Sequence, residues 1–280
     1  MCRFDFVLRF TQVDVFTDQF MTGNPVAVVH DADGLDTDQM AALANWTNLS
    51  ETTFLLTPTD PAADYRLRIF TPQRELPFAG HPTIGSARAW LAAGGAPKSD
   101  GPLVQECAAG LISLRGDGDR LAFAAPPLLR GGPVDPATVE RLGAALRLEP
   151  GRIVDTQWAD NGPGWVVALL EDADTVLGLE PDAAAFGDTR AVGVVGPGGV
   201  ADFEVRAFSA RGLLREDPVT GSLNAGIAQW LIPAGKAPSS YVASQGTRLG
   251  RRGRVRVDRV DGEIWVGGDT VVGITGAVAL

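Results

Sequence analysis

The segment Thr83–Ala93 has the sequence TIGSARAWLAA, and Ser222–Ile232 has the sequence SLNAGIAQWLI. Both show the periodicity of an α-helix, yet small apolar residues stand where a surface helix would carry charged ones. A helix that is apolar on all sides is expected in the interior of a protein. We therefore predict two buried helices, each enclosed by sheet.

These two helical segments begin with one shared pattern. HPTIGS at residues 81–86 and DPVTGS at 217–222 both have the spacing [His/Asp]-Pro-x-x-Gly-Ser, and they lie 136 residues apart, about half of the chain. Residues 126–136 (PPLLRGGPVDP) are dense in Pro and Gly, as a linker would be. The sequence thus predicts two similar domains, residues 1–126 and 127–280. The sequence leaves open whether the C-terminal strand, residues 270–280, returns to the first half.

Short apolar runs bounded by Gly, Pro, Asp and Asn make up much of the remaining sequence, and they predict β-strands. Two further helices are predicted at Thr37–Ala44 and Pro136–Leu146. The fold class is therefore α/β, of the α+β kind and rich in sheet. The predicted strands are Gln12–Phe16, Pro25–His30, Thr53–Thr57, Tyr65–Thr71, Leu111–Arg115, Trp165–Leu170, Phe203–Ser209, Arg254–Asp258 and Glu263–Val266.

Composition argues against several classes of partner. The 280 residues include 24 basic and 34 acidic ones, and a net charge of −10 disfavours binding to nucleic acid or to an anionic membrane surface. The arginine cluster at 248–256 is expected to be a solvated strand edge. No apolar run is long enough to span a membrane, and the N-terminal stretch lacks the features of a signal peptide. Two cysteines give no disulfide framework, so we expect a cytoplasmic location.

Two titratable residues stand at the starts of the predicted buried helices. His81 and Asp217 both precede a proline, and the N–H groups of a first helical turn form a site for an anion such as a carboxylate. These residues are suited to hydrogen-bonding a polar ligand. The alternative is that Asp217 is an ordinary helix cap and His81 a turn residue.

Glu51 is a candidate acid and base. It lies in Asn48-Leu49-Ser50-Glu51-Thr52, between a predicted helix and an apolar strand, where catalytic groups often lie. A carboxyl group in a dry cleft can exchange a proton reversibly near neutral pH, because desolvation raises its pKa. The alternative is a glutamate at the surface.

Four motifs together resemble the PhzF family of phenazine biosynthesis. They are GNPVAVV at residues 23–29, NLSET at 48–52, ELPFAGHPT at 75–83 and EDPVTGS at 216–222, and they occur in this order. The resemblance covers nearly the whole chain. It implies a fold similar to diaminopimelate epimerase, with two pseudo-symmetric halves, each a curved and mostly antiparallel sheet around a central helix, and an active site in the cleft between them.

The resemblance also implies roles for individual residues. Glu51 takes the place of the catalytic proton carrier, and His81 and Asp217 take the places of its partners. In the type member, the glutamate isomerises trans-2,3-dihydro-3-hydroxyanthranilate by moving a proton between two ring carbons. The implied assembly is a homodimer. The residues expected to bind a small carboxylate substrate are Ser50, Gly80, Thr83, Gly221 and Ser222.

No cofactor is expected. Residues 193–199 (GVVGPGG) lack the GxGxxG spacing of a dinucleotide site, and Lys98 and Lys236 lie in turns that do not suit a pyridoxal Schiff base. His30 and His81 are the only histidines, and neither has acidic or thiol neighbours at the spacing of a metal site.

Two other functions stay open. One is an amino-acid epimerase that uses Glu51 with a second base other than a thiol, because neither buried helix has a cysteine beside it. The other is a small-ligand-binding protein that keeps the fold without turnover.

Overall fold

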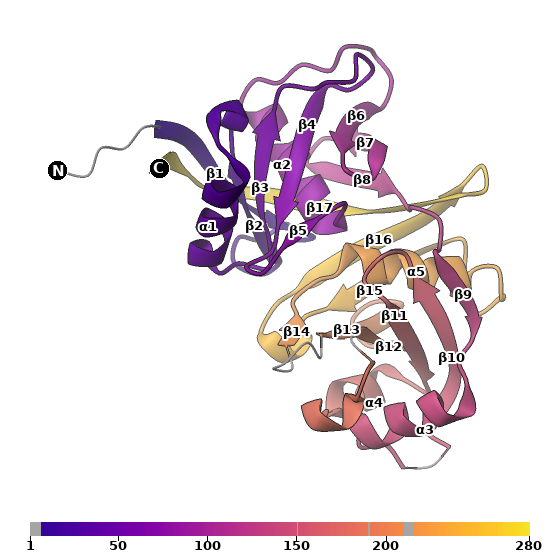
Figure 1. Cartoon of the computed structure of the whole chain (residues 1–280). Helices are drawn as coiled ribbons and strands as arrows, with labels where there is room; N and C mark the ends of the chain where they lie inside the picture. The colour runs from indigo at the N-terminus through magenta and orange to yellow at the C-terminus, as the bar shows by residue number, and fades with distance from the viewer. Residues whose placement is uncertain (1–6, 150, 190, 210–214) are drawn as a thin grey trace. The chain divides into compact units, whose positions relative to one another are not determined.

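The computed structural model describes residues 7–149, 151–189, 191–209 and 215–280. The chain forms two compact units (Figure 1), of which unit 1 comprises Met1–Ala124 with Gly267–Leu280, and unit 2 comprises Ala125–Val266. The sequence analysis assigned the C-terminal residues to the second half and left open their return to the first. They belong to unit 1, because β17 (Glu263–Ala279) pairs antiparallel with β1 (Val7–Val15) from Thr270 to Ala279.

Unit 1 has a sheet that closes around one helix, α2 (Gly80–Ala92). β1 pairs with β17 and β2, β2 pairs in parallel with β3, and β3 pairs with β4. β4 pairs with the short β5 and, in parallel, with β6, which leads through β7 to β8, and β8 pairs with β17. The strands between β1 and β17 are β2 (Asn24–Val29), β3 (Thr52–Leu56), β4 (Tyr65–Phe70), β5 (Glu75–Leu76), β6 (Leu103–Cys107), β7 (Gly110–Asp117) and β8 (Arg120–Ala124).

Unit 2 repeats this order of pairing around α5 (Gly221–Leu231). β10 to β16 pair as β1 to β7 do: antiparallel, parallel and antiparallel, then a short antiparallel strand, a parallel strand and a final antiparallel strand. β9 adds to the free edge of β10. The strands are β9 (Arg130–Pro133), β10 (Ile153–Asp160), β11 (Trp165–Leu170), β12 (Ala191–Pro197), β13 (Phe203–Ser209), β14 (Arg215–Asp217), β15 (Ser240–Gln245) and β16 (Gly253–Val260). The predicted fold of two similar halves is confirmed.

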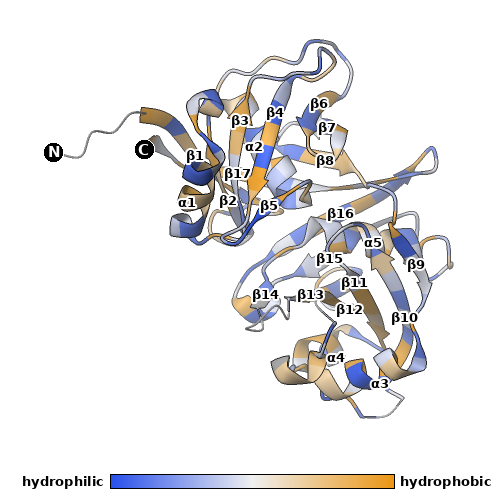
Figure 2. Cartoon of the chain, viewed as in Figure 1, coloured by the Kyte–Doolittle hydropathy of each residue, from blue (hydrophilic) through white to orange (hydrophobic). Residues whose placement is uncertain are grey.

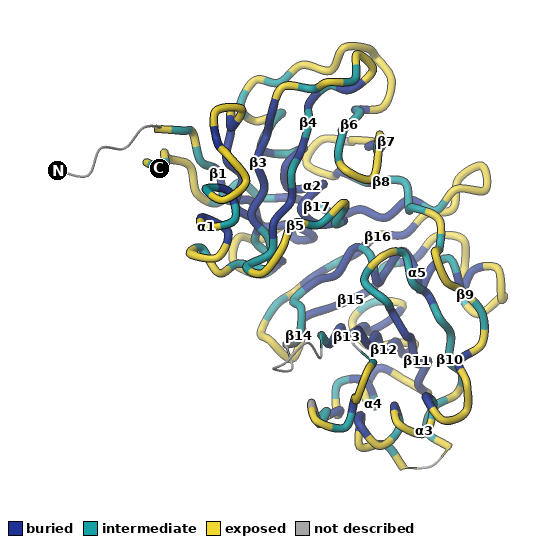
Figure 3. Tube along the Cα trace, viewed as in Figure 1, coloured by how far each residue is buried: buried dark blue, intermediate teal, exposed yellow. Residues whose placement is uncertain are grey.

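The two central helices are buried, as the sequence predicted (Figure 3). Small residues allow their backbones to approach the strands closely. A Cβ atom on Gly85 would lie 2.3 Å from Val26 Cγ1, and one on Gly226 would lie 2.5 Å from the carbonyl oxygen of Ala159. Both distances are far below van der Waals contact, so a larger residue at either position would push the helix from its sheet.

The shared hexapeptide pattern does not occupy equivalent positions in the two units. α2 begins at Gly80, so His81 and Pro82 lie inside its first turn, whereas Asp217 is the last residue of β14 and α5 begins only at Gly221. The pattern thus starts within the first turn of α2 but ahead of α5. Pro82 fits inside α2 because the first N–H groups of a helix have no intrahelical partner to lose.

Outer helices cover the other face of each sheet. In unit 1, α1 (Thr37–Thr47) packs Met40 and Leu43 against Phe54 and Phe70. Since β3 has helices on both faces, all of its residues are buried, whereas β4 alternates hydrophobic residues with partly exposed arginines (Figure 2). Short 3₁₀ helices connect strands in both units: η1 (Ala32–Gly34), η2 (Ala183–Phe186) and η3 (Thr247–Leu249).

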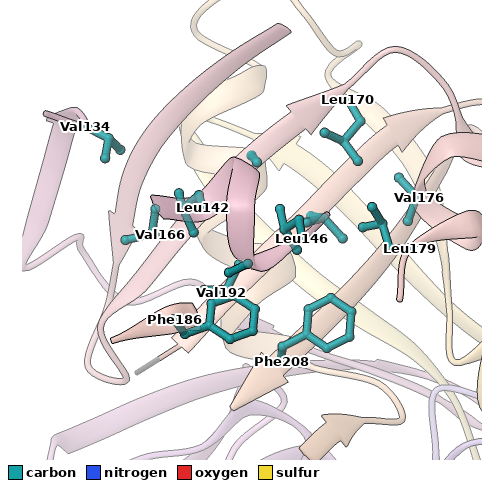
Figure 4. Packing of buried hydrophobic residues seen from close by; sticks show 13 residues of the cluster. Val134, Leu142, Leu146, Val166, Leu170, Val176, Leu179, Phe186, Val192 and Phe208 are labelled. Carbon is teal, nitrogen blue, oxygen red and sulfur yellow. The ribbon is translucent and has the colours of Figure 1, made fainter. Parts of the chain in front are cut away.

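Unit 2 has the corresponding outer core. α3 (Pro136–Ala145) and α4 (Ala173–Gly178) pack on strands β11 to β13, where Leu142, Val176 and Phe208 meet (Figure 4). In the part of the chain that the structure describes, no helix combines the length and the apolar character needed to cross a membrane.

We expect Gly226→Ala to lower the free energy of unfolding by about 1–3 kcal/mol, because the added methyl group meets the backbone of Ala159. Gly143→Ala in α3 is the matched control. Its Cβ would come no closer than 4.0 Å to Ile153, so it should raise the stability by about 0.5–1 kcal/mol. Urea denaturation of both variants measures the difference, and equal stabilities would contradict the close packing of α5.

Candidate functional site

Glu51 is carried by the turn between α1 and β3. α1 ends at Asn48, whose backbone is left-handed (φ 53°), a conformation that asparagine tolerates better than most residues. The hydroxyl oxygens of Thr47 and Thr52, on either side of the turn, lie 2.7 Å apart. This hydrogen bond closes the base of the turn and fixes where β3 begins.

His81 lies beside Glu51 in unit 1. It is the second residue of α2, and its side chain is 5% exposed, compared with 15% for that of Glu51. His81 Nε2 is 3.4 Å from Glu51 Oε2. The structure thus brings together two of the three residues that the sequence analysis selected as catalytic, from elements 30 residues apart in the sequence.

This contact is not an ion pair at neutral pH. Burial lowers the pKa of His81 to about 3, and the nearby backbone carbonyl of Pro25 opposes this shift only in part. The imidazole is therefore neutral, and its ring nitrogens act as one donor and one acceptor.

Asn24 lies beside the other ring nitrogen of His81. The Asn24 side-chain nitrogen lies 3.4 Å from His81 Nδ1, at the long end of hydrogen-bond distances. The backbone carbonyl of Pro25 also contacts the His81 ring, and a carbonyl oxygen can only accept a hydrogen. The Asn24-Pro25 segment of the first motif thus holds the imidazole in place beside Glu51.

The loop before Asn24 is held by a buried carboxylate. Asp14 Oδ2 accepts hydrogen bonds from the backbone N–H groups of Thr22 (2.9 Å) and Gly23 (3.1 Å). Gly23 has no room for a side chain, because a Cβ would lie 2.2 Å from the carbonyl oxygen of Val15. This explains the Gly-Asn-Pro sequence of the first motif as a device that places Asn24 against His81.

Asp217 lies in unit 2, at the end of β14. Thr220 Oγ1 donates a hydrogen bond of 2.6 Å to Asp217 Oδ2. The side chain of Gln245, from β15, contacts both the Asp217 carbonyl and the Thr220 hydroxyl. The sequence predicted no role for Thr220 or Gln245, and the one signal for Gln245 is its position before Gly246, in a stretch where no strand was predicted.

The short strand β14 is anchored by an ion pair. Arg206 of β13 binds Glu216 through two hydrogen bonds, of 3.0 and 2.8 Å, and both side chains are largely buried. Arg206 also donates to the carbonyls of Val176 and Leu179 at the end of α4. Because Glu216 points to the outer face of the sheet, its neighbour Asp217 is turned to the other face.

The first turns of α2 and α5 offer free backbone donors. Within the described residues, the N–H groups of Gly80 and His81 and those of Gly221 and Ser222 have no hydrogen-bond acceptor, and neither helix has a side-chain cap. Ser222 Oγ accepts a hydrogen bond from Trp165 Nε1. Such donors, together with the helix dipole, bind anions.

Two other predicted substrate contacts are placed differently. Thr83 is fully buried, its hydroxyl accepts a hydrogen bond from Gln105, and its N–H donates to Ala79. Its polar groups thus belong to the packing of α2 rather than to an open surface. Ser50 is partly exposed in the turn beside Glu51.

A cavity of about 310 Å³ in unit 1 lies at the far end of α2. It is lined by Trp90, Gly94 and Gly95, and also by His30. His81 and the lining residue Trp90 are nine residues apart on α2, so about 14 Å of helix separates them. The cavity is therefore distinct from the surroundings of Glu51.

Within the described residues, no group of three or more His, Cys, Asp and Glu side chains has the arrangement of a metal site. Cys107 is partly buried, and burial raises the pKa of its thiol. A raised pKa makes a thiol a poor base near neutral pH.

Sequence comparison with known proteins identifies the family of this chain. The family model described as phenazine biosynthesis-like protein (PhzC-PhzF) matches residues 13–277. A Schizosaccharomyces pombe protein named antisense-enhancing sequence 1 is 38% identical over 288 residues, covering 95% of this chain and 97% of that one. The trans-2,3-dihydro-3-hydroxyanthranilate isomerase of Pseudomonas aeruginosa is 34% identical over 253 residues, covering 88% of each chain.

Solved structures similar to this chain support the same family. A PhzF-family phenazine biosynthesis protein from Enterococcus faecalis matches with a TM-score of 0.81 and 25% identity, covering 98% of this chain and all of that one. A hydroxyproline epimerase from Agrobacterium vitis, 16% identical, shares the fold with a TM-score of 0.62, covering 100% of this chain and 94% of that one. The fold is thus that of the epimerase-like proteins, and the chain belongs to the PhzC-PhzF family.

Neither of the two histidines should take up a proton between about pH 8 and pH 5.5, because burial lowers the pKa of His30 to about 4 and that of His81 to about 3. Histidine NMR shifts measure this directly, with His30→Gln to assign the two signals. A signal of the folded protein that titrates near pH 6.5 would contradict it.

The lowered pKa values of His30 and His81 also make the stability of the folded protein depend on pH. Unfolded histidines bind protons near pH 6.5, so below that pH the unfolded state holds more protons than the folded one. Stability should therefore fall as the pH decreases from about 6.5 toward 4, by at most about 1.4 kcal/mol per pH unit for each histidine. His30→Gln should make this slope shallower in urea titrations.

Proposed function

We propose that the protein is an isomerase that moves a proton between two carbon atoms of a small carboxylate substrate, with Glu51 as both base and acid. The observation that carries this proposal is the contact between Glu51 and the neutral, buried imidazole of His81 at the start of α2. A neutral imidazole adds no charge beside Glu51, so the carboxyl group can both take up and release a proton.

The proposed reaction has two proton transfers. The Glu51 carboxylate removes a proton from one substrate carbon, and the electron pair left on that carbon delocalises toward the substrate carboxylate. The Glu51 carboxylic acid then returns a proton to a different carbon, so the product has the composition of the substrate. His81, whose Nε2 lies 3.4 Å from Glu51 Oε2, is proposed to hold the Glu51 carboxyl group in one orientation.

The substrate carboxylate is proposed to bind backbone N–H groups. Gly80 in unit 1, and Gly221 with Ser222 in unit 2, present such donors at helix starts. These donors would stabilise negative charge that grows on the carboxylate as the proton leaves. Asp217 is proposed to accept a hydrogen bond from a polar group of the substrate, which restricts the orientation of that substrate.

The relatives make trans-2,3-dihydro-3-hydroxyanthranilate the first substrate to test. A Pseudomonas aeruginosa relative is named for its isomerisation, whereas the Schizosaccharomyces pombe relative carries a name that gives no reaction.

We further propose that the protein acts without a cofactor, is located in the cytoplasm and forms a homodimer. Turnover by gel-filtered enzyme in the presence of a chelator tests the first of these.

We expect wild-type protein to convert this substrate in D2O and to place deuterium at the carbon that receives the proton. Glu51→Gln should reduce the rate by at least roughly 100-fold, because the amide cannot accept the proton. Glu140→Gln, on the exposed side of α3, is the matched control and should leave the rate unchanged. Absorbance follows substrate loss, and NMR locates the deuterium.

Other outcomes would replace the proposal. Exchange of an α-hydrogen with loss of chirality in an amino acid, still dependent on Glu51, would make the protein an epimerase. Binding of carboxylates with no Glu51-dependent exchange across a panel of carboxylic acids would make it a ligand-binding protein. Equal rates for wild type and Glu51→Gln would remove Glu51 from the mechanism.

A further inference from the structure

Gln245 lies at the end of β15 and is 1% exposed. Its side-chain amide makes four hydrogen bonds. Oε1 accepts from the Thr220 backbone N–H at 3.0 Å and from the Asn224 amide at 2.9 Å. Nε2 donates to the Asp217 carbonyl at 3.2 Å and to Thr220 Oγ1 at 2.9 Å. A buried amide with all of its hydrogen bonds made is held in one position.

The orientation of this amide is decided by two backbone groups. The Thr220 N–H can only donate, so the atom that faces it must be the Gln245 oxygen. The Asp217 carbonyl can only accept, so the atom that faces it must be the Gln245 nitrogen. An exchange of Oε1 and Nε2 would break both bonds.

The fixed amide directs the Thr220 hydroxyl. Because Thr220 Oγ1 accepts a hydrogen bond from Gln245, its own hydrogen is free to point elsewhere, and Asp217 Oδ2 lies 2.6 Å away. The hydroxyl therefore donates to Asp217. The result is a one-way chain of hydrogen bonds from Gln245 through Thr220 to the Asp217 carboxylate, and each bond strengthens the next.

The backbone beside this chain of hydrogen bonds allows the end of β15 to approach the 217–220 turn closely. Gly246, which follows Gln245, has φ +89°, and a Cβ there would lie 2.6 Å from the carbonyl oxygen of Pro218. β15 can therefore end directly against the turn between Asp217 and Thr220. On the other face of the sheet, Arg206 holds Glu216, so the strand that carries Asp217 is fixed from both sides.

We propose that Thr220 and Gln245 are positioning residues that keep Asp217 as an oriented hydrogen-bond acceptor for the reaction. The inference rests on the proposed role of Asp217 and goes beyond it. A carboxylate that receives a hydrogen bond at Oδ2 cannot rotate freely, so it meets the substrate in a single orientation.

The test compares variants of the full chain that differ by one group. Thr220→Val keeps the shape of the side chain but removes the hydroxyl, and Thr220→Ser keeps the hydroxyl but removes a methyl group. Gln245→Glu keeps the shape of the amide but cannot donate to Thr220. Asp217→Asn and Glu51→Gln serve as references, and Thr175→Val on α4 controls for a threonine-to-valine change elsewhere in unit 2.

We expect Thr220→Val and Gln245→Glu to lower kcat/KM roughly 10- to 100-fold, mostly through kcat, because a hydrogen bond to a charged group is lost. Thr220→Ser should retain most of the wild-type value, and Thr175→Val should match it. Thermal denaturation of every variant separates this effect from loss of folding.

Three results would overturn the inference. One is a wild-type kcat/KM for Thr220→Val when Asp217→Asn is impaired. Another is equal loss in Thr220→Val and Thr220→Ser with a matching drop in thermal stability, which would make Thr220 purely structural. The third is full activity of Asp217→Asn, since Asp217 would then have no role to support. Glu51→Gln decides separately whether the proposed function stands, because that variant leaves the hydrogen bonds from Gln245 through Thr220 to Asp217 intact.

Discussion

A helix that is enclosed by sheet must begin inside the protein, and its first N–H groups have no partner there. This constraint applies twice in the chain. α2 and α5 are buried along most of their length, and neither has a side chain that caps its start. Each helix therefore carries partial positive charge without a capping side chain at one defined place in its unit, which suits an anion. Close packing through Gly85 and Gly226 keeps the helices there, since any larger residue would move them from the strands.

The two units share one topology but divide the chemistry unequally. The strands of unit 2 pair in the order of those of unit 1, and both central helices begin with a glycine. The second helical residue is His81 in unit 1 and Ser222 in unit 2, so only unit 1 places an imidazole at this point. The carboxyl groups also differ, because Glu51 precedes a strand whereas Asp217 ends one. A duplicated scaffold thus supports two different sets of side chains.

Burial determines the chemical character of these groups. His81 is neutral because the interior disfavours its charged form, and Asn24 and the Pro25 carbonyl contact its ring beside Glu51. In unit 2, Gln245 and Thr220 direct a hydrogen bond toward Asp217. The imidazole of His81 in unit 1 and the side chains of Thr220 and Gln245 in unit 2 carry no net charge, so these groups set orientation without adding charge.

The sequence by itself determined the fold class, the two buried helices, nine of the strands and the residues proposed to react, because apolar periodicity and short motifs are local properties of a chain. It did not reveal the other eight strands of the described residues, among them β10 and β15, whose polar residues mask the strand pattern, or that α2 begins at Gly80 rather than after Pro82. Only the tertiary structure showed that β17 completes unit 1, that His81 lies against Glu51 and that Gln245 controls the turn at Asp217. These features depend on contacts between residues far apart in the sequence, and the energy of such contacts exists only once the sheets have closed around their helices.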